Sequence, residues 1–357
     1  MIHVGLPTLL NLRESKLPTI KDGNEPKSYT LCINGDVAFA DASEDTNDVA
    51  KAIELVETDG QKVVFGLHTI HGRDNKGLTE AGFKGYLFSS RVFHDQIKRI
   101  AQGTKVFSIS NKNFSECFVG IPSKAEQSKI ARLFSLLDKR IAVQSKLIED
   151  LKQLKSALTN KFIEKLVATC LLIPFSDIYE TAGEGGTPDT TKSEYYERGT
   201  IPFIKIDDLS NKYLQENKDF ITELGLKKSS AWVVPKQSVI FSNGATIGAI
   251  SINTYDVTTK QGILGIVPKA TVDVEFLYYL MSSTYFTKQI HRIITHGTMA
   301  TAYLKDINKI KVPLPIIKEQ KRIVKILSSI SRKQEIEEQI LNQLKIQKQY
   351  LLGQMFI

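Results

Sequence analysis

The feature that most constrains this chain is an internal repeat. Residues 86–100 and 279–293 are identical at nine of fifteen positions, at an offset of 193 residues. A proline, a Glu-Gln pair and an apolar-periodic run recur at the same offset, beginning at Pro122 and at Pro315. Matches at one offset over this length indicate a tandem duplication. The 357 residues therefore hold two versions of a folding unit of about 193 residues.

Each repeat ends in a predicted long helix. Residues 123–169 contain no glycine or proline, and their apolar residues recur at steps of four and three, the pattern of a coiled-coil seam. Ser123 is a good N-cap, and Glu126 completes a capping box. At 1.5 Å per residue the first helix would be about 70 Å long and the second about 50 Å.

Neither helix can bury an apolar stripe alone, so we expect the two to pair; two independent surface helices are the alternative. The predicted seam runs through positions 130, 134, 137, 141, 147, 151, 154, 158 and 162, and through 323, 327, 330, 340, 344, 351 and 355. Its principal pairing residues are Ile130, Leu137, Leu151, Leu158, Ile323, Ile330, Leu344 and Leu351.

The rest of each repeat is predicted to be a mixed α/β globule. Short buried strands are expected at residues 36–40, 63–65, 201–204, 239–241 and 265–267, and helices at 89–100, 274–283 and 285–294. The fold class is therefore α/β or α+β, with two globules separated by two long helices that pair as a coiled coil. The predicted divisions are residues 1–120, 121–172, 173–313 and 314–357.

The net charge of +8 is concentrated in the two helical stretches. Residues 121–170 and 314–357 together carry 18 Lys/Arg and nine Asp/Glu, which leaves the remainder at −1. The globules would have to sort their charges onto one face to bind a polyanion. The three cysteines are far apart, which favours three buried thiols in a reducing cytoplasm over a metal knuckle or disulfide framework. We find neither a transmembrane run nor a signal peptide.

Catalytic motifs are missing from the sequence. It has no P-loop and no Asn/Asp-Pro-Pro-aromatic loop beside a glycine-rich cofactor turn, so neither ATP hydrolysis nor base methylation is indicated. The glycines of residues 183–188 are interpreted as a flexible loop. His68 and His71 lack an evident third zinc ligand. Asp207 or Asp208 with Glu216 and Lys218 only loosely imitates a nuclease site. We predict no enzyme, no metal and no cofactor.

The order of globules and helices along the chain resembles that of a known protein family. A globule, a helix entered through IPSKAEQSKI at 121–130, a second globule and a helix entered through PLPIIKEQ at 313–320 are similar to the specificity (S) subunit of type I restriction–modification systems. The phrases GTP at 186–188, IPFIKI at 201–206, SNGATIG at 242–248 and HGT at 296–298 support the resemblance, as does GDVAFADASED at 35–45. It covers nearly the whole chain.

The resemblance implies a function. Each globule would be a target-recognition domain that reads one half of a bipartite double-stranded DNA site. The paired helices would form an antiparallel coiled coil that acts as a spacer. The subunit would dock two modification (methyltransferase) subunits and, through them, the restriction (translocase and endonuclease) subunits. It would itself be non-catalytic and cytoplasmic, with no membrane partner. A truncated or silent cassette that acts as a non-DNA-binding scaffold is the alternative.

Base-reading residues are expected in loops that differ between the repeats and carry polar side chains. The candidates are Ser43, Asp45, His68, His71, Arg73 and Lys105 in the first globule, and Thr187, Lys205, Asp207, Ser242, Asn243, Lys260, Gln261 and Thr298 in the second. Aligning Val37 with Val239 gives an offset of 202. At this offset, about 28 residues at the start of the second globule would have no counterpart in the first globule. A shortened first recognition domain is therefore expected.

Overall fold

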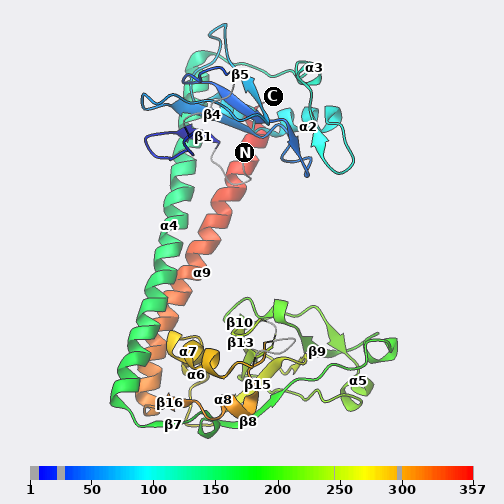
Figure 1. The fold of residues 1–357 in the computed structure, drawn as a ribbon, viewed down its shortest axis with the longest axis vertical. Coiled ribbons are helices and arrows are strands. Elements are labelled where there is room, and N and C mark those ends of the chain that lie inside the picture. The colour runs from blue at the N-terminus through cyan, green and yellow to red at the C-terminus, as the bar shows by residue number, and fades with distance from the viewer. Residues whose placement is uncertain (1–7, 22–28, 245, 296–299, 357) are drawn as a thin grey trace. The chain divides into compact units, whose positions relative to one another are not determined.

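The computed structural model describes residues 8–21, 29–244, 246–295 and 300–356; Figure 1 shows their helices and strands. The chain divides into two compact units. The first unit comprises residues 1–147 and 337–357, and the second comprises residues 148–336. Among the helices of the described residues, none is long and apolar enough to cross a bilayer.

The elements alternate between short strands and short helices. The first unit holds β1 (Leu9–Asn11), β2 (Val37–Ala40), β3 (Ala42–Ser43), β4 (Ala52–Glu57), β5 (Thr69–Gly72), α1 (Lys84–Leu87), α2 (Arg91–Ile100), β6 (Phe107–Ser108) and α3 (Asn111–Phe114). The second holds β7 (Leu172–Pro174), η1 (Phe175–Asp177), β8 (Tyr179–Glu184), η2 (Ser193–Tyr195), β9 (Ile201–Ile204), η3 (Ile206–Asp208), β10 (Tyr213–Leu214), β11 (Phe220–Ile221), α5 (Glu223–Lys227), β12 (Val239–Ser242), β13 (Ile250–Asn253), β14 (Thr258–Thr259), β15 (Ile263–Pro268), α6 (Val274–Met281), α7 (Thr284–Ile293), α8 (Leu304–Ile307) and β16 (Lys311–Pro313). Two long helices belong to both units: α4 (Lys124–Thr169) and α9 (Ile317–Gln354).

The main sheets of the two units share four strands of the same topology, and the second sheet has a fifth strand, β8. The first runs in the order β1-β4-β2-β5 and the second in the order β10-β13-β12-β15-β8. In each, the first-named pair is parallel and the next two are antiparallel. The register agrees as well, since Val37 faces Gly72 as Val239 faces Ile266. The duplication in the sequence is therefore a duplication of fold, and the mixed helix and sheet class is confirmed.

Equivalent helices pack on equivalent sheets. Phe93 and Ile97 of α2 join the core formed with Val37 and Phe39, and Phe286 of α7 joins the core formed with Phe241. Both helices begin in the same way: the hydroxyl of Ser90 or Ser283 accepts a hydrogen bond from the amide three residues later. The cap satisfies an N–H group that has no partner within the helix.

The predicted capping box of α4 is confirmed. The Ser123 hydroxyl accepts from the Glu126 amide at 3.4 Å, and the Glu126 carboxylate accepts from the Ser123 amide at 3.1 Å. Within the first unit α4 and α9 run antiparallel, because Asp138 contacts Lys348 at 2.5 Å whereas the later Gln144 contacts the earlier Glu337. Within the second unit Lys155 of α4 donates to Gln334 of α9 at 2.9 Å.

The predicted seam was wrong by one residue in the middle of α4. Leu147 and Leu154 are 38% and 47% exposed, whereas Ile148 and Ile163 are buried. Ile340 of α9 is also exposed. The helix carries two apolar stripes one residue apart, and the sequence does not show which one faces α9. Of the named pairing residues, Ile323 and Leu344 are buried and the other six are half-buried.

Three further expectations need correction. Residues 63–65 form no strand, although Val63 is buried and its carbonyl accepts the Cys32 amide at 2.9 Å. The glycines of residues 183–188 are tightly packed rather than flexible, because a Cβ on Gly185 would lie 2.0 Å from the Thr259 carbonyl oxygen. Of the three cysteines, only Cys32 is fully buried.

Candidate nucleic-acid interface

Equivalent loops meet at the same end of the main sheet in each unit, and some of the candidate residues lie on them. In the first unit the Asp41 amide donates to the His68 carbonyl, and the Asp41 carbonyl accepts from Ile109 at 2.9 Å. In the second, Asn243 donates to Gly262 at 3.0 Å and accepts from Ala302 at 2.9 Å. We define the first loop cluster as residues 41–47, 66–69 and 102–108, and the second as the described residues of 243–248, 260–262 and 295–302.

An isolated β-bridge lies at equivalent positions of the two units and closes one loop of each cluster. Gln102 pairs with Ser108 in the first unit, and Thr295 pairs with Thr301 in the second, at the repeat offset of 193. The same backbone frame thus carries different side chains in the two units.

The first loop cluster brings four of the six predicted residues together. Ser43 lies on β3, whose pairing with Phe107 of β6 places Lys105 nearby. Asp45 and Lys105 are exposed, and the Asp45 amide donates to the Ser43 hydroxyl at 3.2 Å. His68 is 81% exposed, with Nδ1 3.6 Å from the Asp41 carboxylate. This cluster presents both signs of charge to solvent.

His71 and Arg73 point to a different place. Both contact Asp36, which is buried: Arg73 donates through Nε at 2.9 Å and Nη2 at 2.6 Å, and His71 Nε2 lies 2.9 Å from Oδ2. Burial alone would raise the pKa of Asp36, but these partners and the Ile33 amide hold it below its usual value. The two side chains therefore stabilise an interior carboxylate, and their assignment as base readers loses its basis.

Cys32 completes a group of three possible metal donors with Asp36 and His71, with ligand atoms within 4.8 Å of one another. The chemical state of these three side chains does not favour binding of a metal ion. The Asp36 carboxylate already accepts from Arg73 and Ile33, and burial raises the pKa of the Cys32 thiol to about 11, away from the thiolate that a metal requires.

The predicted residues of the second globule lie on adjoining strand ends. The Gln261 amide donates to the Thr187 hydroxyl at 3.4 Å, and the Lys260 amide donates to the Ile204 carbonyl at 2.9 Å. Lys205 follows Ile204 directly and forms an ion pair with Asp219 at 2.7 Å. Asp207 lies in the next turn, η3, and is exposed together with Lys260 and Gln261.

Ser242 and Asn243 are fully buried, so their side chains do not face a ligand at the surface. Asn243 Nδ2 donates to the Ala302 carbonyl at 3.1 Å, which ties two loops of the cluster together. We therefore correct their role from base contact to positioning of the second loop cluster. Thr298 lies outside the described residues.

Sequence reasoning missed a pair of buried glutamines that join each long helix to its globule. Gln127 Nε2 donates to the carbonyls of Leu78 and Pro122 at 3.0 and 2.8 Å, and its Oε1 accepts the Glu80 amide at 2.8 Å. Gln320 makes the same three bonds, to Thr271, Pro315 and Asp273, at 2.9, 2.8 and 2.8 Å. The repeated Glu-Gln pair was the available signal. We call these two residues the glutamine clamps.

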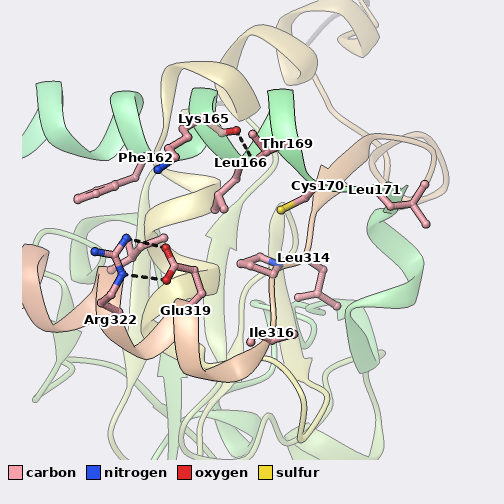
Figure 2. Close-up of a pocket in the computed structure, with 12 residues that line it drawn as sticks. Phe162, Lys165, Leu166, Thr169, Cys170, Leu171, Leu314, Ile316, Glu319 and Arg322 are labelled. Carbon is pink, nitrogen blue, oxygen red and sulfur yellow. Dashed lines mark hydrogen bonds and ion pairs between the residues drawn. The ribbon is translucent and has the colours of Figure 1, made fainter.

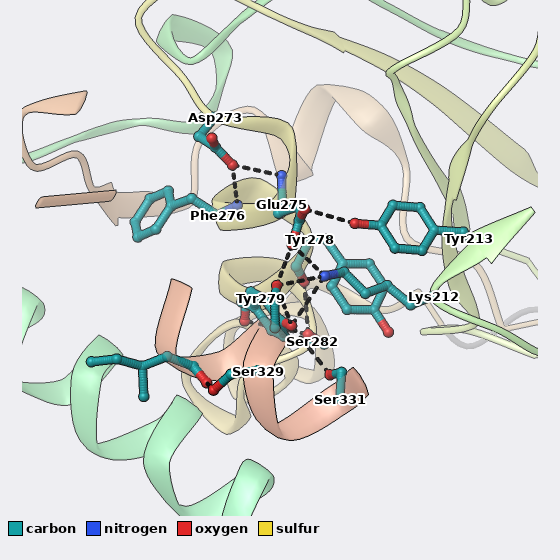
Figure 3. A network of polar contacts seen from close by, with 12 residues as sticks. Lys212, Tyr213, Asp273, Glu275, Phe276, Tyr278, Tyr279, Ser282, Ser329 and Ser331 are labelled. Atoms are coloured by element: carbon teal, nitrogen blue, oxygen red, sulfur yellow. Dashed lines mark hydrogen bonds and ion pairs between the residues drawn. The ribbon is translucent and has the colours of Figure 1, made fainter. Parts of the chain in front are cut away.

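A polar network anchors α9 to the second globule (Figure 3). Lys212 Nζ contacts the Glu275 carboxylate and donates to Tyr279 at 3.1 Å and to Ser328 of α9 at 3.0 Å, while Tyr213 donates to Glu275 at 2.6 Å. Burial works to raise the pKa of Glu275, but hydrogen bonds from Lys212, Ser328 and Tyr213 lower it. All these groups have partners, so the network is structural.

A pocket of about 430 Å³ lies between the end of α4 and the start of α9 in the second unit. Figure 2 shows the residues that line it. Its lining is mostly apolar and includes Phe162, Leu166 and Leu314. Arg322 donates to both oxygens of Glu319, at 2.8 and 2.7 Å. Because these two charges satisfy each other, the pocket does not present an arranged acid and base.

The family model of the type I restriction modification DNA specificity domain matches residues 174–346. The MjaIX specificity subunit of a type I restriction enzyme from Methanocaldococcus jannaschii is 34% identical over 155 residues, which are 43% of this chain and 35% of that protein. The EcoR124I/EcoR124II specificity subunit from Escherichia coli is 28% identical over 235 residues, 60% of this chain and 56% of that protein. The chain is thus similar to type I restriction specificity subunits, and its residues 174–346 match the DNA specificity domain of that family. Its matches span about a third and just over half of these two relatives.

Solved structures of the family share the fold. A chain from a structure of type I R-M system complex assembly superposes with a TM-score of 0.62 at 16% identity and covers 92% of this chain and 83% of that one. The S subunit from M. genitalium gives 0.55 at 17% identity and covers 95% and 87%. The resemblance seen in the sequence is thus confirmed by the domain model over residues 174–346, and the solved structures confirm the fold.

Proposed function

We propose that this chain is the DNA-recognition subunit of a type I restriction–modification complex, and that each unit reads one half of a bipartite target through its loop cluster. The observation that carries this proposal is the equivalence of the two clusters. One backbone frame displays Asp41, His68 and Lys105 in the first unit and Lys260 and Gln261 in the second. A shared frame with different exposed side chains suits two readers of two different base sequences.

The exposed polar groups suit double-stranded DNA. Lys105 and Lys260 can neutralise phosphates, which positions a protein on the duplex. Gln261 and His68 offer donors and acceptors to base edges, and a good base contact is worth about 1–3 kcal/mol of discrimination.

The long helices are proposed as the spacer between the half-sites. With 46 residues, α4 is about 70 Å long, about twice the 34 Å of one DNA turn. The proposed partners are modification subunits, which would bring S-adenosylmethionine, and restriction subunits bound through them. This chain would do no chemistry of its own and would act in the cytoplasm.

The test is base-resolved methylation mapping in cells that carry the complete system. Lys260→Ala and Gln261→Ala should weaken or relax modification at one half-site, while His68→Ala should affect the other. Lys236→Ala is the matched control, because Lys236 is also exposed but precedes β12 at the opposite end of that strand. If the loop variants match the control, or if all variants affect both half-sites alike, the proposal is wrong.

A further inference from the structure

The two main sheets differ at one edge. In the second unit β15 pairs with β12 on one side and with β8 on the other, through partners from Leu264 to Pro268. Its equivalent in the first unit is β5, which pairs with β2 in the same register. Among the described residues no strand lies along the other side of β5. An unpaired edge strand is a template for pairing with another chain.

The second unit shows what covers this edge. Residues 172–184 enter as β7, which pairs with β16, and leave as β8, which pairs with β15. Between the two strands Phe175 and Ile178 are fully buried, and the Phe175 ring lies 5.4 Å from Phe286. The Phe175 amide donates to the Ile310 carbonyl at 2.8 Å. The segment thus combines a strand with two apolar side chains that enter the core.

The first unit has a cavity lined in part by counterparts of residues from the core that Phe175 and Ile178 enter. It measures about 260 Å³ and is lined almost entirely by apolar groups, including Phe39, Leu87 and Val119. These residues are the repeat counterparts of Phe241, Leu280 and Val312, which belong to the core cluster that holds Phe175 and Ile178.

Residues beside the cavity are open to solvent. Leu78 and Ile121, which line it, are 50% and 43% exposed, and Phe118 is 81% exposed. The backbone of Phe118 is already held by Gln96, whose side chain accepts from its amide at 2.9 Å and donates to its carbonyl at 2.8 Å. The backbone of Phe118 is therefore not open for strand pairing, and the edge that remains unpaired beside the cavity is that of β5.

We infer that the cavity and the β5 edge form an acceptor slot for an extended segment of another polypeptide. The segment would carry an aromatic residue followed three residues later by an aliphatic one, both entering the cavity, and would then pair antiparallel with β5 as β8 pairs with β15. This inference rests on the comparison of the two units and is independent of the proposed DNA recognition.

The test uses the full chain and a labelled synthetic peptide with the sequence of residues 172–184, LIPFSDIYETAGE. Fluorescence anisotropy should show saturable binding. A peptide with Phe175→Asp and Ile178→Asp should bind at least tenfold more weakly. In the chain, Leu78→Arg and Ile121→Arg should weaken binding at least tenfold. Leu17→Arg is the control, because Leu17 is 38% exposed and does not line the cavity.

Hydrogen exchange of the wild-type chain tests the inference without any substitution in the chain, so it does not depend on whether a variant folds. In the free wild-type chain the β5 amides should exchange faster than those of β15, and the peptide should slow them while leaving β15 unchanged. Equal protection of β5 and β15 in the free chain would mean that the chain covers its own slot and would overturn the inference. Equal binding of the wild-type peptide and the peptide with Phe175→Asp and Ile178→Asp would overturn it as well. So would protection of the β5 amides by self-association of the chain.

Discussion

Asp36 shows how a single buried carboxylate can redirect the role of its neighbours. The side chain is 1% exposed, and it can remain ionised only because Arg73 and His71 face it and the Ile33 amide donates to it. A buried charge without partners would cost several kcal/mol. Arg73 is consequently a structural residue of the first sheet, although its side chain is of the type that reads guanine in DNA complexes.

Asp36→Asn should lower the free energy of unfolding at pH 7 by about 2–3 kcal/mol, because it leaves Arg73 without its carboxylate. The pKa of Asp36 is lowered on folding, so its stabilisation is complete above its unfolded pKa of about 3.9 and is lost as the pH falls through the folded value. The difference between the variant and the wild type should therefore begin to shrink as the pH falls below about 4 and should keep shrinking at lower pH. Urea unfolding at pH 7 and pH 3 measures both effects.

Asp59→Asn is the control for that experiment. Asp59 is half-exposed and pairs with Arg13 at 3.3 Å, so its loss should cost less than about 1 kcal/mol. Equal unfolding midpoints for the Asp36 and Asp59 variants at pH 7 would contradict the structural role given to Asp36.

At the scale of elements, the glutamine clamps determine where each long helix leaves its globule. Each clamp satisfies two carbonyls and one amide at a buried joint. A helix that starts beside a globule without such bonds would bury unpaired backbone groups, which proteins avoid. The joint is therefore a fixed junction.

Gln320→Ala should destabilise the chain by about 2–4 kcal/mol, since three hydrogen bonds of about 0.5–1.5 kcal/mol each are lost at a buried site. Glu319→Ala, one residue earlier, removes only a partly exposed ion pair with Arg322 and should cost less than about 1 kcal/mol. Thermal unfolding of both variants makes the comparison. A cost for the Gln320 variant no greater than that of its neighbour would show that the clamp is dispensable.

The helix seam gives a graded prediction. Leu344→Asp places a charge at a buried position and should cost more than about 3 kcal/mol, whereas Leu147→Asp lies at an exposed position and should change stability little. Leu151→Asp, at a half-buried position, should fall between them. Chemical denaturation measures the free energy of unfolding of the three variants. Equal losses of stability for the Leu147 and Leu344 variants would support the seam predicted from the sequence instead.

Repetition made much of the fold predictable, and the limits have physical causes. The strand at Val239 and the capping box of Ser123 and Glu126 follow from local patterns. The seam register does not, because the choice between two apolar stripes depends on the partner helix. The assignment of base contacts to the loop clusters stays a prediction. The internal contacts of Asn243 and Arg73 were not foreseen, because burial of a polar side chain depends on tertiary contacts that a single sequence does not display.

At the scale of the whole molecule, the proposal predicts that base identity and spacing are separable. Replacing residues 174–312 by the second domain of a relative should change one half-site and leave the other half-site and the spacer unchanged. The reason is that each unit has its own core and its own loop cluster. Methylation mapping reads both half-sites in one experiment, and a change in both would contradict the modular proposal.

Shortening the helices should have the complementary effect. Removing one heptad from each keeps their antiparallel contacts in step and removes about 10 Å of rise, close to three base pairs. The unread spacer should shorten while both half-sites keep their bases. Altered base identity with an unchanged spacer would contradict the role of the helices as a ruler.

The glutamine clamps also bear on how such a chain can evolve. Because Gln127 and Gln320 make the same three bonds at matching positions of the two repeats, a crossover between the two joints exchanges one globule for another and leaves every hydrogen bond of the junction intact. Recombination at this point would generate new combinations of globules without a folding penalty at the border. The joint is thus a natural breakpoint for shuffling, as well as a mechanical connection.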